Sequence, residues 1–294
     1  MFSAWLFAAL PSDPLVGSAE YYFEKHQFVI SMKAWEDLNE RYPYNPQILT
    51  KLADHQLLLL GRIRARDTLI AAVQSGRLTP EGVEIVTQHL HIINAKFLTD
   101  DGQSNYLQAR TRLGLKDFAK AETLLNSANR LEDSNTAVLL SLAECQFAQR
   151  EIERYITTQK SLVAIDPGNW SLRLQLVEAL LHESKATQAL EFFGTPSGIP
   201  KTEGVQLAYG VSLYETGNWD GARTIFNALS QQREIVNPIA WYYLGKLNEM
   251  ASKSSASYYF NRFIATAHNR KRPSWDPYKV DERVGQLMAK AKAG

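Results

Sequence analysis

A pattern of small and aromatic residues recurs along this 294-residue chain at intervals of roughly 30–36 residues. Its clearest copy spans residues 203–238, where Gly210 and Ala222 would let two helices cross closely. Between them, Gly217 and Asn218 would end the first helix and turn the chain back. Each copy of the pattern therefore predicts one helical hairpin.

The same plan recurs six more times. The further copies lie at residues 19–43, 49–69, 104–133, 137–167, 170–195 and 238–266. Pro43, Pro167 and Pro238 each come shortly before the next helix, where a missing N–H is tolerated because the first helical turn has no internal partner for it. The sequence thus predicts an all-α chain of stacked hairpins, each burying its core against its neighbours.

Three short patterns inside these copies are shared with a known repeat. They are Trp241-x2-Leu244-Gly245, with Asn248 in place of the aromatic residue that follows, Ala222-x3-Phe226, and the closing Asp166-Pro167. In these residues, and over roughly residues 15–266, the chain resembles the tetratricopeptide repeat (TPR) family. The resemblance implies an α-solenoid of about seven TPR-like helical hairpins that binds another protein in its concave groove.

The period breaks between Val73 and Gln103, where the chain holds one helix more than the hairpins require. Thr79-Pro80-Glu81 is a typical helix start, with a capping hydroxyl, a proline and an acid in the first turn. Apolar residues then recur at helical spacing as far as Phe97. We expect an extra helix near 80–98 that forms a seam between two hairpins before it and a longer array after it.

The end of the chain predicts one more helix, from Tyr278 to Ala291, with Val280, Val284 and Leu287 on one face. Such an amphipathic helix is expected to cap the exposed end of the stack. The predicted segments are, in order, an apolar N-terminal tail (1–14), a TPR-like pair (15–75), the extra helix and seam (76–103), the main TPR-like array (104–266), and a loop with the capping helix (267–294).

In the TPR family the first helix of each hairpin lines the groove, and the resemblance carries this role to particular positions here. The predicted partner-binding residues are Glu20, Phe23, Asp54, Tyr106, Arg110, Glu144, Phe147, Glu178, Tyr214, Tyr242 and Lys246. Together they would form an apolar and aromatic trough with acids along much of its length; Arg110 and Lys246 are the exceptions. A basic or amphipathic peptide segment of a partner would fit such a trough.

The sequence contains none of the motifs that carry common enzyme chemistry: no phosphate loop, no H-E-x-x-H, no G-x-S-x-G and no paired C-x-x-C. Its only cysteine, Cys145, excludes an intrachain disulfide. His89 and His91 lie two residues apart on the extra helix, on nearly opposite sides, so they cannot bind one metal ion together. We therefore expect no catalytic site, no cofactor and no metal.

The charge balance narrows the class of partner. Lys and Arg total 32 and Asp and Glu total 31, so the net charge of +1 gives no general attraction for nucleic acid or anionic lipid. No apolar run reaches the ~18–20 residues of a membrane span, and the basic cluster at residues 268–272 is expected to be a solvated loop. A protein or peptide ligand and a cytoplasmic location are favoured; a leader before Met1 would instead indicate the periplasm or envelope.

Three alternatives stay open at this stage. The first is an exported accessory protein for envelope assembly or secretion. The second is a self-assembling oligomer in which residues 2–10 dock into the groove of a neighbour. The third is an enzyme or carbohydrate-binding solenoid, which would need a polar pocket with converging carboxylates and aromatic rings.

Overall fold

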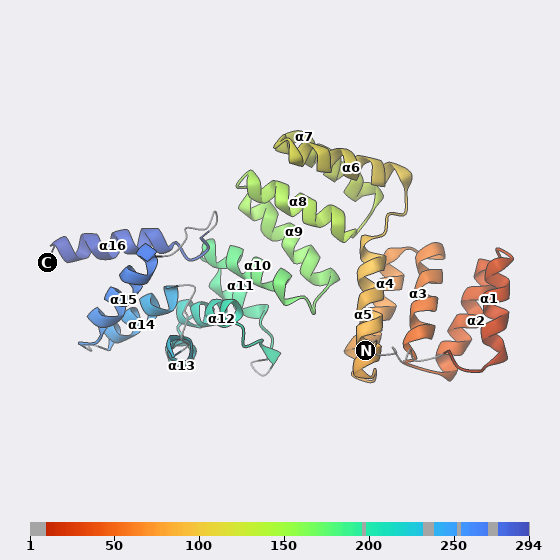
Figure 1. Ribbon diagram of the computed structural model, residues 1–294, viewed down its shortest axis with the longest axis horizontal. Helices are drawn as coiled ribbons and strands as arrows, with labels where there is room; N and C mark the ends of the chain where they lie inside the picture. The colour runs from red at the N-terminus through yellow and green to blue at the C-terminus, as the bar shows by residue number, and fades with distance from the viewer. Residues whose placement is uncertain (1–9, 196–197, 232–237, 252–253, 270–275, 294) are drawn as a thin grey trace, which may run out of the picture. The chain divides into compact units, whose positions relative to one another are not determined.

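The computed structural model describes residues 10–195, 198–231, 238–251, 254–269 and 276–293, and these residues form sixteen α-helices and no strand (Figure 1). Most of the predicted tail (residues 1–9) and part of the basic cluster (270–272) lie outside this described part. The helices are α1 (Pro14–Glu24), α2 (Phe28–Arg41), α3 (Pro46–Leu59), α4 (Arg62–Gln74), α5 (Pro80–Ala95), α6 (Asp100–Gly114), α7 (Phe118–Leu131), α8 (Thr136–Ala148), α9 (Ile152–Ile165), α10 (Trp170–His182), α11 (Ala186–Glu191), α12 (Glu203–Glu215), α13 (Trp219–Ser230), α14 (Ile239–Met250), α15 (Ala256–Asn269) and α16 (Val280–Ala293). In chain order they are seven pairs, with α5 and α16 outside the pairs, which confirms the predicted fold class.

The chain divides into two compact units, residues 1–151 and residues 152–294, so that α1 to α8 belong to the first unit and α9 to α16 to the second. This boundary falls inside the predicted main array at 104–266, whereas the predicted seam at 76–103 lies within the first unit. The five-segment division of the chain therefore stays a prediction.

Five of the hairpin turns share one backbone arrangement. A residue with positive φ follows the first helix, and the next N–H bonds back to a carbonyl of the last turn, as Asp117 does to Arg112 at 2.9 Å. The positive-φ residues are His26, Lys116, Arg150, Ser184 and Gly217. Such turns satisfy carbonyl groups that the ending helix leaves free. Lys116, Arg150 and Ser184 are spaced about 34 residues apart. The repeat period is therefore visible in the backbone conformation even where the side chains at these positions differ.

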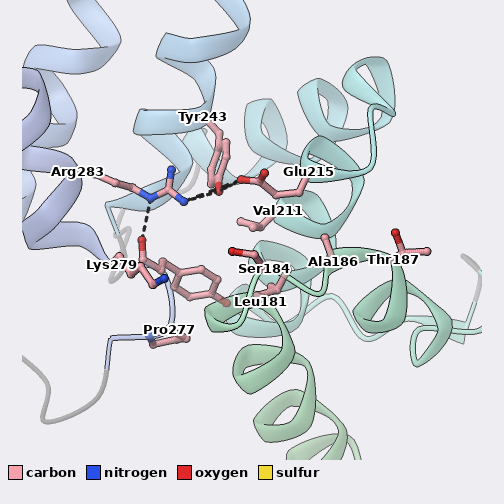
Figure 2. A pocket seen from close by; sticks show the side chains of 11 residues that line it. Leu181, Ser184, Ala186, Thr187, Val211, Glu215, Tyr243, Pro277, Lys279 and Arg283 are labelled. Carbon is pink, nitrogen blue, oxygen red and sulfur yellow. Dashed lines mark hydrogen bonds and ion pairs between the residues drawn. The ribbon is translucent and has the colours of Figure 1, made fainter. Parts of the chain in front are cut away.

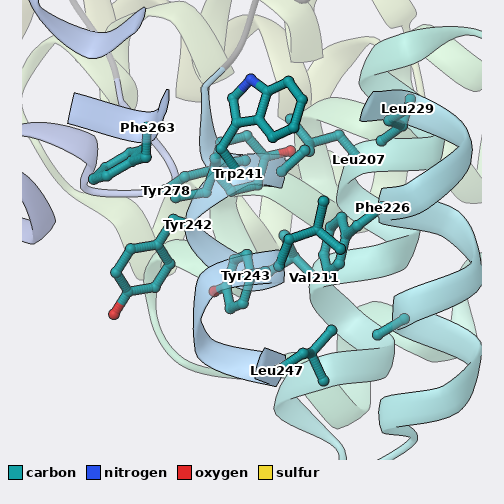
Figure 3. Close-up of a cluster of buried hydrophobic side chains, with 14 of the residues drawn as sticks. Leu207, Val211, Phe226, Leu229, Trp241, Tyr242, Tyr243, Leu247, Phe263 and Tyr278 are labelled. Carbon is teal, nitrogen blue, oxygen red and sulfur yellow. The ribbon is translucent and has the colours of Figure 1, made fainter. Parts of the chain in front are cut away.

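Close helix crossings confirm the role predicted for the small residues. A Cβ atom at Gly210 would lie 2.8 Å from the ring of Phe226, and one at Gly245 would overlap the ring of Phe260. Any side chain at these two positions would push the helices of a hairpin apart. The next layer is aromatic: Tyr243 of α14 stacks on Phe226 of α13 with ring centroids 5.3 Å apart (Figure 3).

The predicted extra helix is present as α5. Its first turn is capped as expected, because the Thr79 hydroxyl accepts a hydrogen bond from the Gly82 N–H at 3.1 Å. Val86, Leu90 and Ile93 are buried in one cluster with residues of α3 and α4. The helix therefore extends the core of the second hairpin.

A buried ion pair holds the chain on either side of α5. The Arg62 guanidinium lies 2.9 Å from the Glu132 carboxylate, and both side chains are essentially inaccessible to solvent. Arg62 also donates to the Lys96 carbonyl at 2.6 Å, while Glu132 accepts from the backbone N–H groups of Leu98 and Thr99. A Cβ atom at Gly102 would overlap the Glu132 side chain. We call this group the Arg62–Glu132 cluster; it joins α4, the α5–α6 loop and the end of α7.

No helix in the described part of the chain is long and apolar enough to cross a membrane.

Candidate partner-binding surfaces

All eleven predicted groove residues lie on the first helix of a hairpin. The first unit holds Glu20 and Phe23 on α1, Asp54 on α3, Tyr106 and Arg110 on α6, and Glu144 and Phe147 on α8; the second holds Glu178 on α10, Tyr214 on α12, and Tyr242 and Lys246 on α14. Their binding role stays a prediction, but their surroundings differ strongly between the two units.

The first three of these residues surround one hollow between α1 and α3. It has a volume of about 330 Å³ and is lined by Glu20, Phe23, Glu24, Trp35, Lys51, Asp54 and His55. We call it the Phe23 hollow, since the Phe23 side chain leaves 45% of its surface exposed there. Three carboxylates and one lysine border it, so its rim is acidic.

His55 holds one wall of the Phe23 hollow in place. His55 is buried, with Nδ1 2.7 Å from the Lys51 carbonyl and Nε2 2.8 Å from the Ser31 hydroxyl. Its ring also meets the Phe23 ring edge to face, with centroids 5.0 Å apart. Sequence reasoning missed His55; the available signal was its spacing of four residues from Lys51, which puts both on one helical face.

One acid of this hollow already has a partner within the first unit. The Asp54 carboxylate lies 3.0 Å from Nε2 of His89 on α5. Sequence spacing alone could not pair His89 with a residue 35 positions earlier on another helix.

The remaining predicted residues of the first unit form a second surface on α6 and α8. Arg110 and Glu144 pair with each other at 2.7 Å while both stay largely exposed. The Tyr106 ring packs against Phe97 with centroids 5.0 Å apart. An exposed ion pair of this kind contributes only about 0.2–1 kcal/mol, so a ligand can replace it at small cost.

In the second unit two of the predicted residues, Glu178 and Tyr242, contact the chain's own C-terminal segment, residues 276–293, whereas Tyr214 packs on Tyr243 and Lys246 pairs with Glu249. The Tyr278 hydroxyl donates to Glu178 at 3.3 Å. The Arg283 guanidinium lies 4.6 Å from the centre of the Tyr242 ring and 5.1 Å from that of Tyr243. These contacts cover part of the surface that the sequence assigned to a partner.

The far end of the same segment meets α14 through a second cation. The Lys290 ammonium lies 2.5 Å from Glu249, whose other oxygen is 2.8 Å from Lys246. The hydrogen bonds from these two lysines hold the pKa of Glu249 below its usual value. The segment therefore contacts α10 and α14 in succession, and α12 through Arg283.

A hollow of about 270 Å³ stays open beneath this segment, bordered by α10, α12 and α14 (Figure 2). Arg283 points into it from α16: its Nε donates to the Tyr278 carbonyl at 2.9 Å and its Nη2 to the Tyr243 hydroxyl at 3.0 Å. Glu215 lies 3.9 Å from the guanidinium, which is a loose ion pair. Burial opposes the charge of Arg283, but the surrounding Tyr243, Tyr242 and Glu215 outweigh it and raise its pKa.

Glu178 is the electrostatically unusual group of this surface. Burial raises the pKa of its carboxyl to about 7, and the hydrogen bond from Tyr278 opposes that shift only in part. Burial also raises the pKa of Tyr278 itself well above the usual value. Within the described residues Glu178 forms no ion pair, and its polar partner is the Tyr278 hydroxyl.

The predicted cap is present, with a wider role than expected. Val284 and Leu287 of α16 pack against the cluster that contains Phe263 and Ala267 of α15, as a cap should. The same segment also lies on the first helices of three hairpins. Sequence reasoning identified the amphipathic helix but not this second set of contacts.

Among the residues that the structure describes, no group of three or more His, Cys, Asp or Glu side chains is placed so that it could hold a metal ion.

The comparisons with known proteins bear on the repeat itself. The stretch 205–233, which covers most of α12 and all of α13, matches the family model described as tetratricopeptide repeat. Over this stretch the chain is similar to a tetratricopeptide repeat. The predicted resemblance to the TPR family is thereby confirmed, in the copy whose pattern was clearest. The chain matches no curated protein.

Several solved structures are similar to the chain at low identity. MamA from Desulfovibrio magneticus RS-1 (residues 41 to the end) is 12% identical with a TM-score of 0.49, covering 60% of this chain and 99% of that one. A tetratricopeptide repeat protein from Parabacteroides merdae is 12% identical with a TM-score of 0.41, covering 94% and 98%. A thermophilic TPR protein from Thermus thermophilus is 19% identical with a TM-score of 0.39, covering 65% and 99%.

Proposed function

We propose that this protein is a non-enzymatic interaction scaffold that holds a basic or amphipathic segment of a partner protein against the first helices of its hairpins. The Phe23 hollow is the observation that carries the proposal. It offers an exposed aromatic ring beside the carboxylates of Glu20, Glu24 and Asp54. An apolar side chain flanked by Lys or Arg fits such a site, the apolar part on the ring and the cations on the acids.

The rigidity of the hollow supports binding of useful strength. His55 is held by Ser31 and by the Lys51 carbonyl, and it supports the Phe23 ring from one side. A ring that is already positioned loses little rotational freedom when a ligand arrives, so more of the contact energy appears as affinity.

The second unit supports the same ligand chemistry. There the first helices α12 and α14 meet Arg283 and Lys290 through Glu215 and Glu249. A cationic helical segment is therefore the kind of ligand that these faces accommodate, in this case within one chain.

The test is photo-crosslinking from the hollow. Phe23 is replaced by the photoreactive p-benzoylphenylalanine, and the crosslinked partner segment is identified by mass spectrometry in extracts of the source cells. We expect a segment rich in Lys or Arg next to apolar residues. Adding Glu20→Lys and Glu24→Lys should reduce its yield about tenfold, because two attractions become repulsions.

The matched control reverses the same number of charges on the second helix of the same hairpin. Asp37→Lys with Glu40→Lys changes two exposed residues of α2 and should leave the yield unchanged. Equal yields in both double variants, or an acidic crosslinked segment, would refute the proposal.

A further inference from the structure

We propose that the first helices α10, α12 and α14 form a second docking surface for a cationic amphipathic helix of a partner, which binds by displacing the chain's own C-terminal segment. The inference rests on the proposed function for the class of ligand, but it concerns other residues and another unit. Four observations support it in turn.

The first observation is that the C-terminal segment is attached in the manner of a ligand. Its polar contacts follow one another along the chain, from Tyr278 on α10, through Arg283 on α12 and α14, to Lys290 on α14. Hydroxyl, guanidinium and ammonium groups of a turn and the helix after it thus meet successive first helices, as a peptide segment bound in a groove would do.

The second observation is that full burial of its apolar residues is confined to one end, whereas Val284 and Leu287 are only partly buried against the neighbouring cluster. Tyr278 and Val280 are buried, but no residue from Asp281 to Lys290 is, and 44% of Met288 is exposed. By contrast, α14 beneath it buries every residue from Ile239 to Leu247 except Lys246. Separating α16 from the face therefore exposes far less apolar surface than opening a hairpin does.

The third observation is that the fit beneath the segment is loose. The hollow of about 270 Å³ under it is bordered by Glu215, Arg283 and the Tyr243 hydroxyl. The closest approach of Arg283 to Glu215 is 3.9 Å, at the limit of an ion pair. A longer or better placed cation on a partner would reach Glu215 more closely.

The fourth observation identifies what the segment lacks. Glu178 receives a 3.3 Å hydrogen bond from Tyr278 where a cation would neutralise it, and Tyr155 of α9 is the other titratable group that the structure places close to it. The pKa of Glu178, raised by burial to about 7, is consistent with this missing charge. A partner segment with Lys or Arg in the place of Tyr278 would supply it.

The partner is therefore defined by chemistry and spacing. It is a turn followed by an amphipathic helix, as in residues 276–293, with cations at the position of Tyr278 in the turn and at those of Arg283 and Lys290 on the helix, so that each meets one acid of α10, α12 or α14. The C-terminal segment supplies two of the three and acts as a weaker competitor for the same face.

The experiment uses the full chain and a fluorescent peptide with the sequence of residues 276–293 carrying Tyr278→Lys, followed by fluorescence anisotropy. We expect it to bind the native chain, and to bind about tenfold tighter when the chain carries Arg283→Ala and Lys290→Ala, because its competitor is then weakened. Gln286→Ala, an exposed change on the same helix, should leave the affinity unchanged.

Two further arms make the result decisive. Glu178→Gln in the chain removes the acid that the added lysine of the peptide meets and that the native segment leaves without a cation, so it should weaken the peptide at least tenfold. Glu20→Lys with Glu24→Lys should not weaken it, which separates this surface from the Phe23 hollow. Lys290→Ala alone, at a residue that is 70% exposed, repeats the test should the double variant fold poorly. No binding, or the same affinity in native and variant chains, would overturn the proposal. A doubled mass of the double variant in light scattering would do so too, since a second copy would then occupy the face.

Discussion

Glu132 in the first unit and Glu178 in the second are both withdrawn from water, yet their pKa values move in opposite directions. Burial raises both. At Glu132 the hydrogen bonds from the Leu98 N–H, the Thr99 hydroxyl and N–H, and the Arg62 guanidinium outweigh it, and the pKa falls below its usual value. At Glu178 one tyrosine hydroxyl does not suffice, and the pKa rises to about 7.

The difference shows that donors, not depth, decide whether a buried carboxylate keeps its charge. Glu132 has a closed set of partners and serves the fold. The ionised form of Glu178 would be stabilised by a nearby cation, and the described part of the chain places none beside it. The three predictions below test this contrast, beginning with the largest expected effect.

The largest loss of stability is expected when Arg62, the cation that pairs with Glu132, is removed. Arg62→Ala leaves Glu132 buried without its counter-ion and removes the shorter of the two hydrogen bonds to the Lys96 carbonyl, which keeps the one from Asn135. We expect the free energy of unfolding to fall by about 3–5 kcal/mol, measured by urea denaturation. Arg64→Ala, an exposed change on the same helix, should stay within about 0.5 kcal/mol of the native chain. A loss below about 1 kcal/mol for Arg62→Ala would show that the ion pair does not hold this cluster together.

Neutralising Glu178 should raise the free energy of unfolding, in contrast to the loss expected for Arg62→Ala. The folded chain keeps this proton up to about pH 7, whereas the unfolded chain releases it near 4.5, so the free energy of unfolding falls as pH rises between these values. Glu178→Gln removes the titration and keeps an acceptor for Tyr278. We expect it to stabilise the protein by about 3 kcal/mol at pH 8 and hardly at all at pH 4.

The control for this prediction is Glu191→Gln, an exposed residue of the same unit, which should leave the pH profile of stability as it is in the native chain. A Glu178→Gln protein that is no more stable than the native chain at pH 8 would mean that Glu178 already has a counter-charge in solution.

The smallest effect is expected at the exposed end of the C-terminal segment. Lys290→Ala removes an ion pair whose lysine is 70% exposed. The free energy of unfolding should fall by less than about 1 kcal/mol, and the difference should vanish in 1 M salt, where the Debye length is about 3 Å. A loss that persists in high salt would show that α16 is anchored more firmly than the docking proposal requires.

Much of the fold could be predicted because its determinants are local. Gly217 ends α12, Thr79 caps α5, and Gly210 marks a close crossing, and each acts within its own hairpin or helix. The other hairpin turns were less visible, since His26, Lys116, Arg150 and Ser184 take the positive φ that glycine would signal. Arg62 and Glu132 could not be paired in advance, because their meeting depends on how the extra helix packs.

The candidate sites divide in the same way. Repeat spacing placed all eleven predicted residues on first helices, since that assignment follows from the period alone. It could not show that Asp54 meets His89 or that Glu178 meets Tyr278, 100 positions later. Contacts between distant repeats depend on how successive hairpins are rotated, and one chain's spacing does not contain that information.

The Arg62–Glu132 cluster has a consequence for how the protein can come apart. In a simple solenoid each repeat contacts only its neighbours, and the array can fray from either end one unit at a time. Here one side-chain cluster joins residues 62, 96–99 and 132. The stretch from α4 to the end of α7 is therefore expected to open as a single cooperative block, whose amide protons exchange together rather than repeat by repeat.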